Sequence, residues 1–159
     1  MTDETSIAQV DTRDPSVRAL IQRHVTFSIA STTPENVFAL SAEDLAAPGI
    51  VLFGLKVNGA LAGIAALRPL GDGDCELKSM HVAREFRGRG LGKALLDHMI
   101  DEARSRIFQR ILLETGSGSS YEAARKIYVE AGFEPRGPFA QYPNAEESIF
   151  YELDLVPVD

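Results

Sequence analysis

The sequence contains no tryptophan, one cysteine, and fewer basic than acidic residues. Because Cys75 is alone, no disulfide can form within the chain. A net charge of -7 and a pI of about 5.0 argue against a general nucleic-acid-binding protein, which needs a basic surface. No apolar run approaches the ~20 residues that span a bilayer, and MTDETSIAQV lacks the basic and apolar regions of a signal peptide. We therefore expect a cytoplasmic protein that binds neither nucleic acid nor membranes.

The composition is typical of a folded domain. The chain has 159 residues, of which 45% are hydrophobic and 25% are charged, and it has no low-complexity tract. A chain of this size can bury a full core, and its apolar content is too high for a disordered segment. We expect a single domain over residues 1–159.

The apolar pattern predicts a mixed α/β fold. Asp14 and Pro15 suit an N-cap and a first helical residue, and apolar residues follow at helical spacing. Asn58 and Gly59 separate two apolar runs, which is a strong signal for a two-residue hairpin. Helices are expected at 14–31, briefly within 31–49, at 91–105 and at 121–132, and strands at 50–57, 60–70, 75–82, 110–115, 133–137 and 148–155.

The stretch EFRGRGLGKALLDHM, residues 85–99, carries the clearest functional signal. Gly88, Gly90 and Gly92 alternate with Arg87 and Arg89 and lead into an amphipathic helical pattern. The first turn of a helix has unpaired N–H groups and a partial positive charge, and glycines allow an anion to approach the backbone. A strand, this loop and a helix therefore predict a pyrophosphate site. The alternative is a tight turn with solvated arginines.

Two other phosphate loops fit the residues poorly. A nucleoside-triphosphate P-loop requires G-x-x-x-x-G-K-[ST], but Ala94 stands where the magnesium-binding hydroxyl would be. A dinucleotide fold requires its glycine loop within a parallel βαβ unit, whereas the strands before this loop form a hairpin. Both interpretations are set aside.

Two motifs in this order resemble the GNAT superfamily of acetyl-CoA-dependent N-acetyltransferases. Arg87, Gly90 and Gly92 match the acyl-CoA motif [QR]-x-x-G-x-[GA], and ARKIYVEAGF resembles the later LY-x-x-x-GF, with Ile127 in place of leucine. The resemblance covers about residues 50–155. It implies a mostly antiparallel central sheet that splays at the cofactor strand and is flanked by helices.

The resemblance also implies the cosubstrate and its contacts. Acetyl would pass directly from acetyl-CoA to an amine in a ternary complex, with a backbone N–H of SMHV as the oxyanion donor on a bulged strand. No metal is implied, and family members often form a homodimer. The implied cofactor-binding residues are Met80, His81, Val82, Arg87, Gly88, Arg89, Gly90, Leu91, Gly92 and Lys93.

Catalytic roles follow from the same resemblance. Tyr128 occupies the tyrosine of the later motif, and a phenol that is protonated at neutral pH can donate to the departing thiolate. Glu76, on the strand before the cofactor loop, is the first candidate for the general base, with His81 and Glu114 as alternatives. Without a catalytic role, Tyr128 would be a tyrosine of the core. Glu76 would then be a solvated charge at a strand edge or the partner of a lysine.

Two features depart from a simple assignment. Many family members have asparagine seven residues before the helix tyrosine, where this chain has Tyr121. A cofactor contact is therefore either lost or replaced, with Ser119 and Ser120 as the candidates for a replacement. No base or carboxylate partner is readable for Cys75, which we expect to be a small buried residue rather than a nucleophile.

The acceptor amine is not identified by the sequence. The first 49 residues resemble the family in helix placement alone, and such enzymes vary there with substrate. His24, Ser28, Glu35 and Asn36 could contact an acceptor, as could Tyr142 in the segment GPFAQYPNAEES. The alternative function is a non-catalytic acyl-CoA-binding or sensing domain on the same fold.

Overall fold

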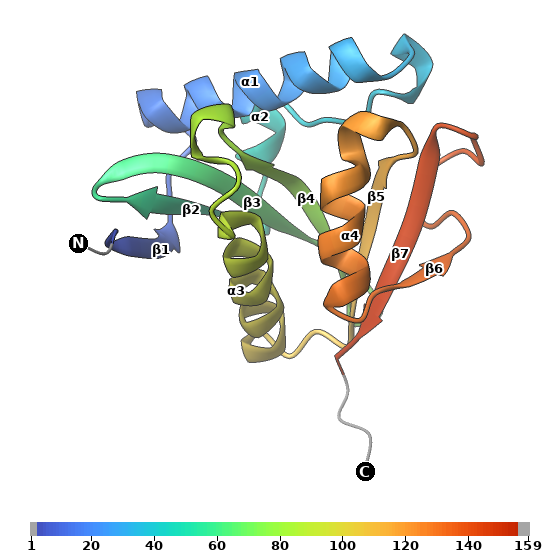
Figure 1. Ribbon diagram of the computed structural model, residues 1–159. Coiled ribbons are helices and arrows are strands. Elements are labelled where there is room, and N and C mark those ends of the chain that lie inside the picture. Colours follow the sequence, from blue (N-terminus) through green and yellow to red (C-terminus); the bar gives the residue numbers. More distant parts are fainter. Residues whose placement is uncertain (1–2, 156–159) are drawn as a thin grey trace.

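The computed structural model describes residues 3–155 and has a seven-stranded sheet at its centre (Figure 1). The strands lie in the order β1-β2-β3-β4-β5-β7-β6. Within this sheet β4 and β5 run parallel, and the other neighbours run antiparallel. The strands are β1 (Thr5–Gln9), β2 (Val51–Val57), β3 (Ala60–Gly71), β4 (Asp74–Val82), β5 (Arg110–Gly116), β6 (Glu134–Arg136) and β7 (Ser148–Asp154).

The helices confirm the expected pattern. Asp14 caps the first helix by accepting a hydrogen bond from the Ser16 backbone N–H, and Gly132 follows the last helix with φ of 103°. Short 3-10 turns η1 (Pro34–Asn36), η2 (Arg84–Phe86) and η3 (Ser119–Tyr121) complete the connections. The α-helices are α1 (Pro15–Ser31), α2 (Ala42–Leu45), α3 (Leu91–Ser105) and α4 (Glu122–Glu130).

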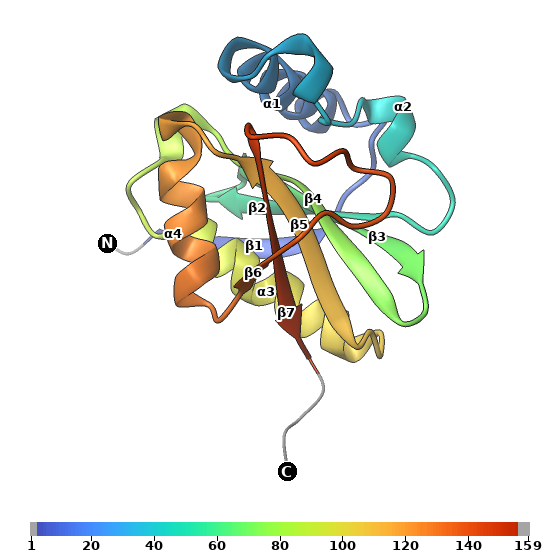
Figure 2. The same ribbon diagram turned by 90° about the vertical axis from the view of Figure 1, so that its right-hand side faces the viewer.

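Helices lie on both sides of the sheet (Figure 2). An apolar cluster packs on each face. Successive strand side chains point to opposite faces, so Ile111 and Leu113 pack with α3 and α4, while Leu112 packs with Phe139 and Phe150. On that second face α1 and α2 pack on β2 and β3, and their contacts form a separate apolar cluster that includes Leu20. This alternation fixes which strand residues can reach the site.

Strand β1 was not expected from the sequence. Its residues TSIAQ are largely exposed and carry little apolar alternation, so nothing in their pattern marks a strand. They form a strand because they pair antiparallel with β2, from Thr5 opposite Val57 to Gln9 opposite Phe53. An edge strand of this kind is determined by its neighbour rather than by its own propensity.

Strands β4 and β5 part soon after they begin to pair. Their ladder extends from Asp74 opposite Arg110 to Glu76 opposite Leu112, although β4 continues to Val82 and β5 to Gly116. Near the parting β4 also bulges, because Ser79 and Met80 together face the single residue Ala65 of β3. The expected splay and bulge are therefore present.

Gly116, at the end of β5, leaves room for the ring of Tyr121. A Cβ at Gly116 would lie 2.3 Å from Tyr121 Cδ2, whereas a Cβ at Gly118 would have no atom within 4 Å. We expect Gly116→Ala to lower the free energy of unfolding by roughly 1–3 kcal/mol through overpacking, and Gly118→Ala to change it little. Urea denaturation of both variants measures this, and equal stabilities would contradict the close packing.

Candidate functional site

A cavity of about 450 Å³ lies where β4 and β5 part, between α1 and α4. One part, the loop end, is lined by the glycine-rich loop and the first turn of α3. The other part, the acceptor end, is lined by His24, Ser28, Lys78, Glu114 and several residues of the segment 32–39. The cavity therefore joins the predicted anion site to the region where the sequence predicts an acceptor.

The glycine loop has the geometry of an anion site. Gly88 and Gly90 have φ of 80° and 76°, in the left-handed region that favours glycine. Gly90 precedes α3, whose N-terminus has no side-chain cap from the described residues and no acidic residue in its first turn. The N–H groups of that turn are thus available to an anion.

Gly92 has a packing role. A Cβ at Gly92 would lie 3.0 Å from Ile127 Cδ1 on α4, tighter than ordinary van der Waals contact. The absence of a side chain here allows α3 and α4 to approach each other beside the cavity. Glycine at position 92 of the acyl-CoA motif is therefore explained by close helix packing and not by a backbone conformation that favours glycine.

The basic residues of the loop differ in their placement. Arg87 lines the cavity, and its Nε donates to the backbone oxygen of Val82 at 3.0 Å. Lys93 also lines it and pairs with Asp97 at 2.8 Å. Arg89 is the exception among the predicted cofactor residues, because it lies outside the cavity lining and pairs with Asp3 at 3.5 Å.

The bulged part of β4 faces the cavity. Met80, His81 and Val82 all line it, and their contact with the cofactor stays a prediction. Ser79, at the bulge, has φ of 58°, and its buried Oγ has no hydrogen-bond partner among residues 3–155. The bulge and the parting of β4 from β5 place this stretch of backbone beside the cavity.

His24 of α1 and His81 of β4 form a hydrogen bond with each other. Their Nδ1 atoms are 3.1 Å apart, so one must donate to the other. Burial, together with the nearby His81 and Lys78, lowers the pKa of His24 to about 3. Burial lowers the pKa of His81 to about 4, with added effects from Arg87 and Arg23. The pair is therefore neutral at pH 7.

Tyr128 and Glu114 both face the cavity from adjacent elements. Tyr128 on α4 is nine-tenths or more buried, and burial raises its pKa, with a further contribution from the charge of Glu114. Glu114 on β5 accepts a hydrogen bond from Ser148 Oγ at 2.8 Å. Burial raises the pKa of Glu114 despite this hydrogen bond and the nearby charge of Lys78. A proton donor and a proton acceptor thus share one cavity.

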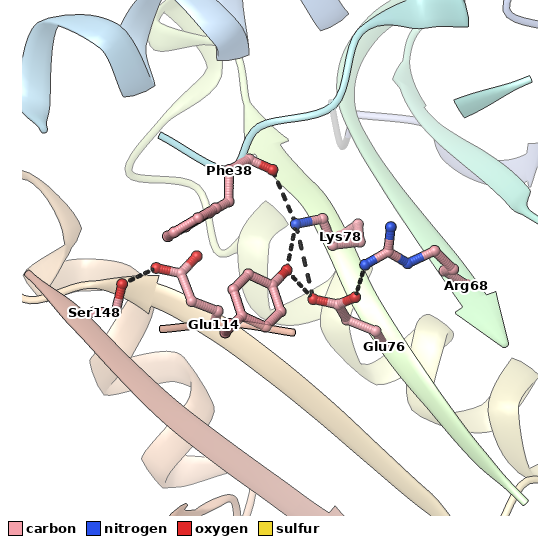
Figure 3. Close-up of polar contacts among 7 residues, drawn as sticks. Phe38, Arg68, Glu76, Lys78, Glu114 and Ser148 are labelled. Carbon is pink, nitrogen blue, oxygen red and sulfur yellow. Dashed lines mark hydrogen bonds and ion pairs between the residues drawn. The ribbon is translucent and has the colours of Figure 1, made fainter. Parts of the chain in front are cut away.

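Glu76 lies behind the cavity wall in a buried polar cluster (Figure 3). Its side chain is fully buried and accepts hydrogen bonds from Arg68 and from the Tyr142 hydroxyl. Lys78 Nζ lies 3.8 Å from Glu76 Oε2, the oxygen that also accepts from Tyr142, so the lysine partner foreseen for Glu76 is present. Glu76 does not line the cavity, and its role as the base stays a prediction.

Cys75 has the environment of an inert thiol. It is fully buried, lies outside the cavity lining, and burial raises its pKa to about 12. A thiol with so high a pKa is almost entirely protonated at neutral pH and is a poor nucleophile.

Several acceptor candidates reach the cavity and others do not. His24, Ser28 and Asn36 line it, whereas Glu35 and Tyr142 do not. Ser120 lines it, next to Tyr121, which stands where the family resemblance expects asparagine. The Tyr121 hydroxyl shares a hydrogen bond of 3.1 Å with Thr32 Oγ1, and its ring contacts that of Phe27.

Sequence reasoning missed Lys78 as a residue of the site. It lines the cavity, and its Nζ donates to the Phe38 backbone oxygen at 3.1 Å and to Tyr142 Oη at 2.8 Å. Burial lowers its pKa, while the charge of Glu76 opposes that effect. Lys78 lies two residues after Glu76 on the same strand and therefore on the same face, and this spacing is the signal that could have found it.

Comparisons with known proteins agree with this geometry. Residues 17–133 match the acetyltransferase (GNAT) family. The uncharacterized N-acetyltransferase YsnE of Bacillus subtilis is 36% identical over 139 residues, which cover 87% of this chain and 92% of that protein.

Solved structures share the fold. One assigned as an acyl-CoA N-acyltransferase from Klebsiella pneumoniae has a TM-score of 0.79 and 25% identity, covering 96% of this chain and 98% of that one. A Salmonella typhimurium structure assigned as an acetyltransferase, solved with its cofactor acetyl-CoA, has a TM-score of 0.71 at 21% identity, covering 96% and 94%. Within residues 3–155, none of the helices has the length and apolarity to cross a membrane.

The histidine pair predicts a pH-dependent stability. Between about pH 4 and the ordinary histidine pKa of 6.5, the unfolded chain binds more protons than the folded chain, so stability falls as pH falls through this window. His24→Gln removes one of these groups and retains a hydrogen-bond partner for His81. We expect a shallower loss of melting temperature from pH 7 to 4.5, and an unchanged slope would contradict the buried neutral pair.

Proposed function

The chain belongs to the GNAT family of acetyltransferases, and we propose that it transfers acetyl from acetyl-CoA directly to an amine within a ternary complex. The observation that carries this proposal is the single cavity between β4 and β5. It connects an uncapped, glycine-led helix N-terminus to the half-buried carboxyl of Glu114 and the buried phenol of Tyr128. The inert environment of Cys75 supports direct transfer over an acyl-cysteine route.

The residues at the loop end fit coenzyme A. The free N–H groups at the start of α3 would hold the diphosphate, with Arg87 and Lys93 adding positive charge. The backbone of Met80 to Val82 would hold the pantetheine arm and offer an N–H to the acetyl carbonyl oxygen. Bound acetyl-CoA supplies the acetyl group as a reactive thioester.

We assign the base to Glu114. Its carboxylate lies in the cavity, and its raised pKa brings it closer to that of a neutral-pH base. Glu114 takes a proton from the amine nitrogen, directly or through a water, as the nitrogen bonds to the acetyl carbon. Glu76 instead stabilises the adjacent strand end through Arg68 and Tyr142.

We assign the acid to Tyr128. Its raised pKa keeps the phenol protonated, and the hydroxyl has no hydrogen bond to another described residue. Tyr128 donates its proton to the coenzyme A sulfur as the carbon–sulfur bond breaks. Since Glu114 gains one proton and Tyr128 loses one, a transfer between them restores both groups.

The second candidate function is a non-catalytic acyl-CoA-binding domain. The loop end alone would serve it, because binding needs no acid or base. Two ionisable side chains beside the cavity, the buried Tyr128 and the half-buried Glu114, favour the enzyme, since removing them from water costs stability that binding does not require. Release of coenzyme A thiol from acetyl-CoA that depends on an added amine distinguishes the two functions.

Tyr128→Phe tests the acid. The ring packs beside Phe133 and Tyr151, and phenylalanine preserves these contacts. We expect turnover to fall roughly 10- to 100-fold while the dissociation constant for acetyl-CoA, measured by calorimetry, stays the same. The matched control Tyr151→Phe lies outside the cavity lining and should retain full turnover. Equal turnover in both variants would remove the role of Tyr128.

Glu114→Gln and Glu76→Gln together identify the base. Wild-type kcat should fall at low pH as Glu114 becomes protonated. Glu114→Gln should lower kcat roughly 100-fold and abolish this limb of the profile, whereas Glu76→Gln should lower stability and keep the limb. A low-pH limb that survives in Glu114→Gln and disappears in Glu76→Gln would reverse the assignment.

A further inference from the structure

The acceptor end of the cavity is bounded by the segment 32–39, which joins α1 to α2. Thr32, Asn36, Val37, Phe38 and Ala39 of this segment line the cavity. Figure 3 shows Phe38 of this segment beside Lys78 and Glu114, with its backbone oxygen accepting a hydrogen bond from Lys78 Nζ. The way this segment is held determines which molecules can reach Glu114.

Glu147, just before β7, binds the first half of the segment. It accepts hydrogen bonds from the Thr33 backbone N–H at 3.1 Å, from the Thr33 hydroxyl, and from Asn36 Nδ2 at 3.0 Å. These hydrogen bonds lower the pKa of Glu147, so its carboxylate is charged at neutral pH. A charged acceptor with several donors makes stronger hydrogen bonds than a neutral one.

The segment 32–39 makes further contacts on both sides of the residues that bind Glu147. Before it, Thr32 Oγ1 bonds to Tyr121 Oη of η3 at 3.1 Å. After it, the Phe38 backbone oxygen accepts from Lys78 Nζ at 3.1 Å, and the Phe38 ring contacts the Tyr142 ring at 5.0 Å. The segment is therefore joined to η3, β4 and the β6–β7 connection.

This arrangement disfavours a polypeptide acceptor. A peptide chain approaching Glu114 past this segment would separate it from β7 or from η3. Separation would break the part-buried hydrogen bonds from Asn36 to Glu147 and between Thr32 and Tyr121. A compact molecule can occupy the acceptor end without disturbing these contacts.

The lining specifies the chemistry of that molecule. Phe27, Val37 and Phe38 offer apolar and aromatic surface, and Glu114 offers the carboxylate that an ammonium group would approach. Glu114 is the one carboxylate among the described residues that line the cavity, and Lys78 Nζ lies at the same end, so a second ammonium group on the acceptor would have no carboxylate partner there. The lining thus favours one amine on an apolar body.

We propose that the acceptor is a compact monoamine with an apolar or aromatic body, selected by the segment 32–39 that Glu147 holds in place. The inference rests on the proposed acetyl transfer. It assigns Glu147 as a positioning residue that acts through Thr33 and Asn36 and does not touch the reacting atoms.

A panel of acceptors tests the substrate class. With acetyl-CoA fixed, coenzyme A thiol release is measured for phenethylamine, the polyamine spermidine, and a hexapeptide with a free N-terminal alanine. We expect kcat/KM for phenethylamine to exceed the other two by at least about tenfold. A peptide or spermidine that is acetylated faster would overturn the inference and leave the proposed function standing. No transfer to any amine by a protein that binds acetyl-CoA would overturn both.

Substitutions at Glu147 test the positioning role. Glu147→Ala should raise KM for phenethylamine about tenfold or more, with the dissociation constant for acetyl-CoA unchanged. Thr33→Val, which removes the hydroxyl donor and retains the backbone donor, should give a smaller change in the same direction. The matched control is Glu146→Ala at the neighbouring exposed carboxylate, which should keep the wild-type KM. Equal KM values for Glu147→Ala and Glu146→Ala would contradict the role of Glu147.

Discussion

The parting of β4 from β5 after Glu76 and Leu112 is the constraint on which the site depends. A continued ladder would pair the backbone of β4 with β5 and close the space between them. Because the ladder ends early and β4 bulges at Ser79 and Met80, the strands enclose a cavity. The same parting brings the glycine-led start of α3 and the side chain of Glu114 to opposite ends of that cavity.

Directly at the parting, a buried polar cluster takes the place of apolar packing. Glu76 is bound by Arg68 and Tyr142, and Lys78 joins it from the cavity side. Burying charges is costly unless they are paired and hydrogen-bonded, and each of these groups has such partners. The cluster thereby presents one ammonium group, that of Lys78, at the acceptor end. It also links β4 to the β6–β7 connection, which carries Tyr142.

The sequence predicted the elements with strong local signals and missed those made by tertiary contacts. The capped start of α1, the hairpin at Asn58 and the bounds of α3 could be derived because their residues act locally. Strand β1 could not, because its pairing with β2 is what orders it. The resemblance indicated which loop and strand form the site, but it could not show that Arg89 turns to Asp3.

The site chemistry was predicted less completely than the fold. Nothing in the sequence around Glu76 and Glu114 distinguishes the two carboxylates. Their hydrogen-bond donors, Tyr142 and Ser148, distinguish them, and these donors lie far along the chain. The same holds for Glu147, whose contacts with Thr33 and Asn36 span more than a hundred positions. Local patterns carry no information on such pairings.

Amide hydrogen exchange with and without coenzyme A tests the central claim most directly. If the parted strand and the start of α3 form the binding surface, amides at 80–82 and 88–93 should become protected when coenzyme A is added, and β1 and β6 should not change. Unchanged exchange at both stretches under saturating coenzyme A, or protection confined to another part of the sheet, would contradict the account.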